Sequence, residues 1–323
     1  MTGKPKVAIC WLGGCGGCDE AVVDLNEVLL TVADAVDIVL WPIALDFKYD
    51  HVKAMADGEI TLSIINGNVR NSEQEEVAKL LRKKSQIVLA FGACACFGGT
   101  PGMANFRSKE DIFNWVYKDA PTVNNPNGVF PQPVSNVDKK ELTLPAFHES
   151  VKSLNQVIDV DYYLPGCPPP TDLIAHAVTA TLENKLPMKG SSLAPHKALC
   201  DSCPRNSTKP QKIKLTEIKR IHEIEAKPDI CFLAQGVLCM GIATRDGCGH
   251  NCIDINLPCR GCFGPVEGVR DAGIKMISTL AAIIDAETDK DIEKITEQII
   301  DMAGYNFRFS LPSSMFGSLK NPE

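Results

Sequence analysis

Cysteine content is the feature that most restricts how this chain can fold. The 323 residues include fourteen cysteines, and eight of them fall between positions 200 and 262. The chain opens with a short polar stretch that leads into a strand-like run, without a signal peptide or a twin-arginine pair, so we expect a cytoplasmic protein. Because the cytosol keeps thiols reduced, the cysteines predict metal ligands, redox thiols or small buried side chains rather than disulfides.

Charge and hydropathy narrow the choice of partners. The chain has 33 basic and 40 acidic residues, a net charge of -7, which favours neither nucleic acid nor an anionic membrane surface. Its apolar runs are all shorter than the ~18 residues expected of a membrane-spanning helix. We therefore expect no nucleic-acid partner and no membrane association.

Strand-like and helix-like segments alternate through the first half of the chain. Apolar runs predict strands over residues 6–12, 37–45, 60–66, 86–92 and 157–164. Helical periodicity predicts helices over residues 18–35, 72–84 and 171–184, the second with Ser72 as its N-cap. This β-α-β order predicts an α/β fold: a flavodoxin-like, doubly wound parallel sheet over residues 1–190.

The pattern changes in two other regions. Between residues 100 and 150, five prolines from Pro121 to Pro145 stand among Asn, Gly and Ser, and so long an irregular stretch predicts a surface that meets a partner. Over residues 191–323 the cysteines are separated by few regular elements, and such a region folds around metal. We expect a loop-rich iron–sulfur cluster domain there, closed by helices at about 268–284 and 289–302.

Four cysteines follow predicted strands at the same end. Cys15 and Cys18 come after the first strand, Cys94 after the fourth and Cys167 after the fifth. The carboxyl ends of parallel strands share one edge of a sheet, where ligands bind. The fold would therefore gather four thiolates, which is the ligand set of a 4Fe–4S cluster.

A redox dithiol is the main rival interpretation of this group. A Cys-x-x-Cys after a strand is also typical of thioredoxin-like oxidoreductases, although that hypothesis leaves Cys94 and Cys167 unexplained. Cys10, inside the first strand, is expected to be a buried core residue. Cys96 is ambiguous, and we interpret it as a neighbour of the group rather than a ligand.

Eight further cysteines supply two more sets of four thiolates. Taken in order, they are Cys200, Cys203, Cys231 and Cys239, then Cys248, Cys252, Cys259 and Cys262. One ligand could be exchanged between the sets, as in bacterial ferredoxins, and His250 could replace one. Paired Cys-x-x-Cys is equally a structural zinc signature, so a zinc-stabilised interaction protein stays open. The cluster predicted on Cys15, Cys18, Cys94 and Cys167 makes two further clusters a better interpretation of the eight cysteines than two zinc ions.

The cysteine motifs resemble those of the small subunit of nickel–iron hydrogenases, over nearly the whole chain. The segments that carry the resemblance are WLGGCGGC at 11–18, GACACFGG at 92–99 and GCPP at 166–169. They match, in order, the family's proximal-cluster motif. The resemblance therefore implies a proximal cluster on Cys15, Cys18, Cys94 and Cys167. It implies a distal cluster on Cys203, Cys231 and Cys239, and a medial cluster on Cys248, Cys259 and Cys262.

Two departures from the family pattern indicate a branch. Many members have a histidine where this chain has Cys200, and many lack a fourth medial ligand where this chain has Cys252. Both features, with the missing export signal, resemble the cytoplasmic archaeal enzymes. The chain is most similar to the small subunit of the methyl-viologen-reducing, deazaflavin-nonreducing hydrogenase of methanogens. The deazaflavin-reducing hydrogenase is the alternative, and the related quinone-reductase subunit of respiratory complex I fits less well.

The resemblance implies a role in electron transfer without catalytic residues in this chain. A separate large subunit would hold nickel and iron and split hydrogen. Electrons would then pass through three 4Fe–4S clusters and a small iron–sulfur linker subunit to the heterodisulfide reductase complex. All twelve cysteines of the three sets would serve as cluster ligands, so catalysis would need the partner subunit. We therefore expect oxidoreductase activity only in the assembled hydrogenase.

Overall fold

A five-stranded parallel sheet organises the first half of the chain in the computed structural model, which describes residues 3–317. Its strands are β1 (Lys6–Trp11), β2 (Asp37–Leu40), β3 (Ile60–Asn66), β5 (Ser85–Phe91) and β9 (Tyr162–Leu164). They lie in the order β2-β1-β3-β5-β9, and every pair is parallel. This is the flavodoxin-like strand order, so the predicted fold class is confirmed.

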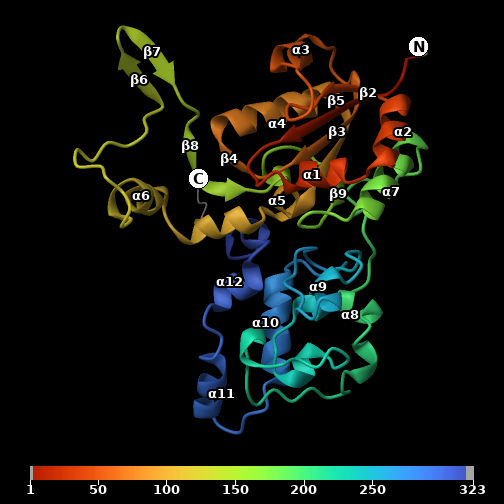
Figure 1. Cartoon of the computed structure of the whole chain (residues 1–323), viewed down its shortest axis with the longest axis vertical. Coiled ribbons are helices and arrows are strands. Elements are labelled where there is room, and N and C mark those ends of the chain that lie inside the picture. The colour runs from red at the N-terminus through yellow and green to blue at the C-terminus, as the bar shows by residue number, and fades with distance from the viewer. Residues whose placement is uncertain (1–2, 318–323) are drawn as a thin grey trace.

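Helices cover both faces of the sheet (Figure 1). One face packs against α1 (Gly17–Val23), α2 (Glu27–Ala35) and α7 (Thr171–Leu182), the other against α3 (Tyr49–Ala54), α4 (Ser72–Lys84) and α5 (Gly92–Phe97). Successive side chains of a strand point to opposite faces. In β1, Val7 and Ile9 join one core while Ala8 and Cys10 join the other. A strand buried on both faces reads as a continuous apolar run, which explains why the sequence revealed it.

Two elements end earlier than the sequence predicted. The single helix expected over 18–35 is wrong, because Asn26, with a φ of 51°, separates α1 from α2. Asparagine adopts such left-handed angles more readily than most residues. The strand expected over 37–45 stops at Leu40, and Pro42 follows two residues later. Proline has no backbone N–H to donate to a strand ladder.

The cap of α4 is also different from the prediction. The helix begins at residue 72 as expected, but Asn71 rather than Ser72 is its N-cap. Asn71 Oδ1 accepts from the Gln74 backbone N–H at 2.9 Å, and Gln74 Oε1 accepts from the Asn71 N–H at 3.2 Å. This reciprocal pair is a capping box. Strand β9 is likewise shorter than the predicted strand over 157–164, because the 3-10 turn η3 (Leu154–Gln156) and a loop precede it.

A half-buried ion-pair network ties β9 to its neighbours. Asp161 accepts hydrogen bonds from Arg82 and Lys189, each at 2.6 Å, and from the Val88 backbone N–H at 2.8 Å. Burial by itself would raise the pKa of Asp161. The hydrogen bonds from Lys189 and Arg82 outweigh that effect and hold the pKa below its ordinary value. The network fixes α4 and β5 beside the start of β9.

The proline-rich stretch between residues 100 and 150 contains regular elements, contrary to the irregular segment expected. They are η1 (Thr100–Phe106), α6 (Lys109–Asn114), η2 (Trp115–Asp119), β6 (Val134–Val137), β7 (Lys140–Thr143) and β8 (Phe147–Lys152). Strand β8 pairs antiparallel with β4 (Val69–Asn71), which anchors the stretch to the sheet domain. The β6–β7 hairpin projects away from the body of the molecule (Figure 1).

The cysteine-rich second half lies below the sheet in Figure 1. Its elements are the short α8 (Leu199–Ser202), η4 (Asn206–Thr208), η5 (Ile221–Glu223), η6 (Phe232–Gln235), η7 (Met240–Ile242) and α9 (Asn251–Asp254), followed by α10 (Ala272–Ile283), α11 (Asp289–Thr296), α12 (Met302–Phe307) and η8 (Leu311–Ser313). It has its own core around Phe232, Met240 and Met276. The helix expected over 289–302 is wrong at its end, since α11 stops before α12 begins.

None of the helices within residues 3–317 combines the length and the apolar character needed to cross a bilayer.

Candidate functional site

The structure brings the first four cysteines together at the carboxyl edge of the sheet. Cys15 lies in the loop after β1, Cys18 in the first turn of α1, Cys94 in α5 after β5, and Cys167 in the loop after β9. Burial is the main cause that raises the pKa of Cys18, followed by the nearby thiols of Cys94, Cys167 and Cys15. Burial, together with the thiols of Cys167 and Cys15, raises the pKa of Cys94 to about 12. The four thiols therefore lie near one another, and their role as ligands of one cluster stays a prediction.

Two glycines make room beside these sulfur atoms. Gly92 has a φ of +83° and Gly99 a φ of +66°. A Cβ atom would collide with Cys18 Sγ at the first position and with Cys94 Sγ at the second. Only glycine combines this backbone angle with so close an approach. The loops are thus shaped around the thiols.

Asp19 holds the start of α1 and was missed by the sequence analysis. Its carboxylate is fully buried directly after Cys18. Oδ1 accepts from Trp41 Nε1 at 2.9 Å, and Oδ2 accepts from Asn66 Nδ2 at 2.8 Å. These bonds join α1 to the segment after β2 and to the end of β3, so Asp19 positions Cys18. The sequence feature that could have revealed this role is an acidic residue at a position of α1 that faces the core.

The two remaining cysteines of this half lie in the core. Burial raises the pKa of Cys10 to about 12, and its thiol interacts with Tyr49. Cys96 is buried in α5, and its thiol donates to the Ala90 carbonyl oxygen at 3.3 Å. Both side chains belong to the apolar core on one face of the sheet. The structure thus places Cys96 beside the first group, with its hydrogen bond directed into the core.

The second group consists of Cys200, Cys203, Cys231 and Cys239. Burial raises the pKa of Cys200 to about 12, with further contributions from Cys239, Cys231 and Cys203. A Cβ built on Gly241 would lie 3.3 Å from Cys200 Sγ and 3.7 Å from Cys239 Sγ. Cys200, which stands where the resembled family often has histidine, is therefore close to the other thiols of its group.

The third group consists of Cys248, Cys252, Cys259 and Cys262. Burial raises the pKa of Cys262 to about 12, and the thiols of Cys248, Cys167 and Cys252 add to the effect. Burial also raises the pKa of Cys259, and the thiol of Cys239 in the second group contributes ahead of those of Cys262 and Cys248. Cys252 lies near Cys262, while Cys259 lies near Cys239 of the second group as well as near its own group, so the division of the eight cysteines into two sets stays a prediction.

His250 lies beside the third group through its backbone rather than its ring. Its N–H donates to Cys248 Sγ. Its imidazole Nε2 lies 3.2 Å from Ser202 Oγ and 3.9 Å from Asp246 Oδ1. The ring is therefore engaged with Ser202, and the backbone amide is the part of His250 that meets a thiol.

Backbone N–H groups link the three groups in a line. The N–H of Cys167, in the first group, donates to Cys262 Sγ in the third. The N–H of Cys259, in the third group, donates to Cys239 Sγ in the second. The spatial order along the molecule is therefore first, third, second.

Comparison with known proteins identifies the family. The chain is 43% identical over 317 residues to the iron–sulfur subunit of the F420-non-reducing hydrogenase of Archaeoglobus profundus, covering 96% of this chain and 97% of the relative. This chain belongs to the small-subunit family of nickel–iron hydrogenases. It is also 37% identical over 319 residues to the corresponding F420-non-reducing hydrogenase subunit of Methanothermobacter marburgensis, covering 98% and 97% of the two chains. The resemblance to the deazaflavin-nonreducing branch is confirmed, and so is the classification as an oxidoreductase subunit.

Family and fold comparisons cover different parts of this hydrogenase small subunit. Residues 15–181 match the family described as NADH ubiquinone oxidoreductase, 20 Kd subunit, a span that holds the first cysteine group and ends before Cys200. A solved chain of the H2-activated [NiFeSe]-hydrogenase from Dm. baculatum shares the fold, with a TM-score of 0.50 and 15% identity over 88% of this chain and 99% of that chain.

A second positioning residue of the hydrogenase small subunit is Arg205, which the sequence analysis also missed. Its side chain is 4% exposed and stacks over the Phe232 ring, with Cζ 4.1 Å from the centroid. The guanidinium donates to four acceptors: the carbonyl oxygens of Lys227, Ile230 and Ile253, and Asn256 Oδ1. These acceptors lie on the segments that carry Cys231 and Cys252. A basic residue two positions after Cys203 was the only sequence signal.

The donor chemistry fits iron–sulfur clusters. Within residues 3–317, no group of three or more His, Cys, Asp or Glu residues is arranged to hold a single metal ion. The three groups nevertheless supply four thiols each, and burial, together with neighbouring thiols, raises the pKa values of Cys18, Cys200 and Cys262. Crowded thiolates of this kind need a cationic core to offset their charge.

Proposed function

We propose that this chain relays electrons through three 4Fe–4S clusters between a hydrogen-splitting large subunit and an acceptor. The observation that carries the proposal is the line of cysteine groups, joined by the N–H groups of Cys167 and Cys259 to sulfur atoms of the next group. A relay requires redox centres in sequence, and this arrangement supplies three positions in a row.

The proposed ligands are the twelve cysteines of the three groups. The proximal position has Cys15, Cys18, Cys94 and Cys167; the medial position has Cys248, Cys252, Cys259 and Cys262; the distal position has Cys200, Cys203, Cys231 and Cys239. Iron–sulfur clusters accept and release single electrons at potentials set by hydrogen bonds, charge and burial.

The protein contributes hydrogen bonds, buried charge and space around these thiolates. The N–H of His250 donates to Cys248 Sγ, and the N–H of Gly241 donates to Cys239 Sγ. Hydrogen bonds to thiolate sulfur stabilise negative charge on it. Arg205 adds a buried positive charge between the segments that carry the medial and distal ligands.

A separate large subunit completes the enzyme in this proposal. All four cysteines of each group are assigned, so we place the nickel–iron site and its catalytic residues on that partner. Cys15 and Cys167 are exposed, and Trp11, whose ring lies against Gly14 and Gly16 on either side of Cys15, is 40% exposed. An open face with an exposed indole next to the proximal group supports docking of the large subunit there.

The proposed electron acceptor is inferred from the names of the similar proteins. Because the similar proteins of Archaeoglobus and Methanothermobacter belong by name to F420-non-reducing hydrogenases, we propose a small iron–sulfur linker subunit and the heterodisulfide reductase complex as the onward path. We also propose a cytoplasmic location. In addition, we propose two domains, residues 1–190 and 191–323, since the two parts have separate apolar cores.

Anaerobic purification tests the proposal directly. We expect about twelve irons and about twelve sulfides per chain, as three 4Fe–4S clusters require, together with a co-purifying nickel-containing subunit identified by mass spectrometry. Zinc in place of iron would instead support the zinc-stabilised alternative. About four irons per chain would leave only the proximal cluster and would refute the relay.

A further inference from the structure

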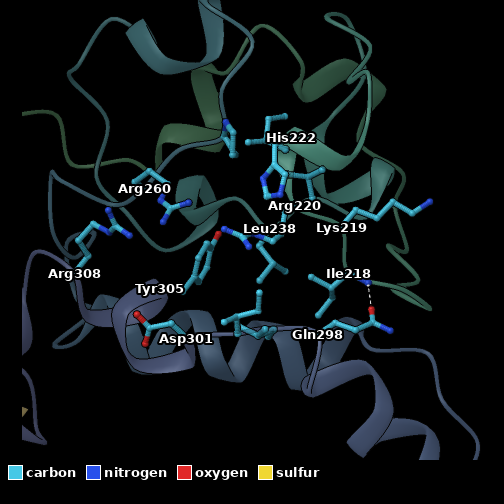
Figure 2. A pocket seen from close by; sticks show the side chains of 15 residues that line it. Ile218, Lys219, Arg220, His222, Leu238, Arg260, Gln298, Asp301, Tyr305 and Arg308 are labelled. Carbon is cyan, nitrogen blue, oxygen red and sulfur yellow. Dashed lines mark hydrogen bonds between the residues drawn. The ribbon is translucent and has the colours of Figure 1, made fainter.

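A cavity of about 350 Å³ opens in the cysteine-rich half, away from the sheet. Its walls come from the segment around η5, from the loop that holds Arg260, and from the chain between α11 and the end of α12 (Figure 2). Tyr305, on α12, lies close to Cys239 and Cys259. The cavity therefore borders both the second and the third cysteine groups.

The lining of the cavity carries more positive than negative charge. Arg220, Arg260 and Arg308 line it, and none of the three forms an ion pair with another residue in the range 3–317. Asp301 adds one negative charge to the lining, and Lys219 adds a positive charge that is paired outside it. Lys219 pairs with Glu217 at 2.9 Å, and Asp301 Oδ1 accepts from the Gly304 N–H at 2.7 Å.

Two buried polar atoms in the same wall lack partners. The Tyr305 hydroxyl and Arg308 Nε are shielded from solvent and form no hydrogen bond with any described residue. Arg260 lies over the Tyr305 ring, with Cζ 5.2 Å from its centroid. Figure 2 shows the polar ends of Arg260 and Tyr305 facing the same space, while Lys219 points away from it. An unpaired buried donor costs free energy, so a ligand that accepts hydrogen bonds would relieve it.

We propose that this cavity binds a small molecule through its phosphate group. Arginine guanidinium groups match the oxygen geometry of phosphate and bind it in bidentate fashion. A doubly charged phosphate would offset most of the charge of the three arginines, and the Tyr305 hydroxyl would donate to one of its oxygens. The cavity volume falls at the lower end of small-molecule sites, so it leaves room for a group esterified to the phosphate.

A ligand in this cavity would affect the two proposed cluster positions beside it. A bound anion beside Cys239 and Cys259 would add negative charge next to two proposed cluster positions. Added negative charge disfavours reduction of a nearby centre, so occupancy would lower the reduction potentials there. The rival explanation is that the three arginines only offset the charge of the cysteine groups.

Calorimetric titration of the anaerobically purified complex tests the site. The probes are inorganic phosphate and AMP, each added at constant ionic strength set with chloride. We expect saturable binding of one anion per chain. The Tyr305→Phe variant keeps the ring under Arg260 and loses only the hydroxyl, so we expect Kd to rise about tenfold, the loss of one charged hydrogen bond.

Charge variants separate a built site from general attraction. Arg308→Gln should raise Kd more than tenfold. Arg270→Gln is the matched control, because Arg270 is exposed and lies outside the cavity wall; its Kd should be unchanged. Tighter binding of AMP than of phosphate would indicate an ester as the natural ligand, and the reverse order would indicate the free anion.

Two results would overturn the proposal. One is the absence of saturable binding of either probe to the complex. The other is equal Kd values for the wild type, Tyr305→Phe and Arg308→Gln, which would mean that the arginines serve the cysteine groups alone. Iron content, measured on the same samples, keeps this outcome distinct from a failure of the electron-relay proposal.

Discussion

Replacement of Arg205 tests how the cysteine-rich half is held together. Its two shorter hydrogen bonds run from Nη2 to Asn256 Oδ1 at 2.8 Å and to the Ile253 carbonyl oxygen at 3.2 Å, while the Nη1 bonds at 3.3 and 3.4 Å are weak. Hydrogen bonds from charged groups contribute roughly 1.5–3 kcal/mol each. Arg205→Met should therefore destabilise this half by about 3–5 kcal/mol.

Arg205→Lys separates charge from geometry. Lysine keeps the positive charge but cannot reach acceptors on both sides with a planar fork, so we expect a loss of about 2 kcal/mol. For a unit of this size, 1 kcal/mol corresponds to about 4 °C in the unfolding midpoint. The lysine variant should therefore lose structure about 8 °C below the wild type.

The assay follows the visible absorbance of the proposed clusters during heating under anaerobic conditions. One fixed scan rate is required, because loss of clusters is irreversible. Arg270→Lys, at an exposed position, is the control and should change the midpoint by less than about 2 °C. If Arg205→Met melts at the wild-type temperature, the guanidinium does not hold the two segments together and the reasoning fails.

Three further perturbations have defined outcomes. Gly92→Ala should lose about four irons per chain, since its Cβ would collide with Cys18 Sγ. Gly58→Ala, at a φ of +73° with open space around it, should keep them. Equal iron content in the two variants would refute the inference that Gly92 makes room for a cluster ligand. Burial opposes ionisation of Asp161, but its basic partners hold the pKa of the folded state below the ordinary value of 3.8. The contribution of Asp161 to the stability of the fold is therefore complete above pH 3.8 and is lost as pH falls through the folded-state pKa. Urea midpoints measured from pH 6 to 3 should fall less in Asp161→Asn, and parallel curves would contradict this. Cys252→Ala should lower iron by about one per chain, and Cys96→Ala should leave iron unchanged; a loss in Cys96→Ala would make that thiol a ligand.

Local pattern was enough to predict the sheet and the edge at which the first four cysteines lie. Strand β3 was predicted at its observed bounds, because a strand buried on both faces is apolar throughout. Parallel topology then required that residues after β1, β5 and β9 meet at one edge. Cys18, Cys94 and Cys167 were placed there by that rule alone, although each is separated from the next by more than seventy residues.

Local pattern failed where a residue's role depends on distant partners. The sequence does not reveal the partners of Asp19 and Arg205, and only those buried partners on other segments make the two side chains positioning residues. The break at Asn26 and the separation of α11 from α12 likewise oppose a helical periodicity that continues through them.

Hydrophobic period and chain order act over short distances, so the amino-acid sequence already specifies most of the sheet, while its division of the thiols into ligand sets stays a prediction. The packing of the folded chain settles the order of the three groups, the contacts of Cys167 with Cys262 and of Cys259 with Cys239, and the basic cavity beside Tyr305. These features arise where loops from separate parts of the chain pack together, and no periodicity in the sequence encodes the distance between such loops.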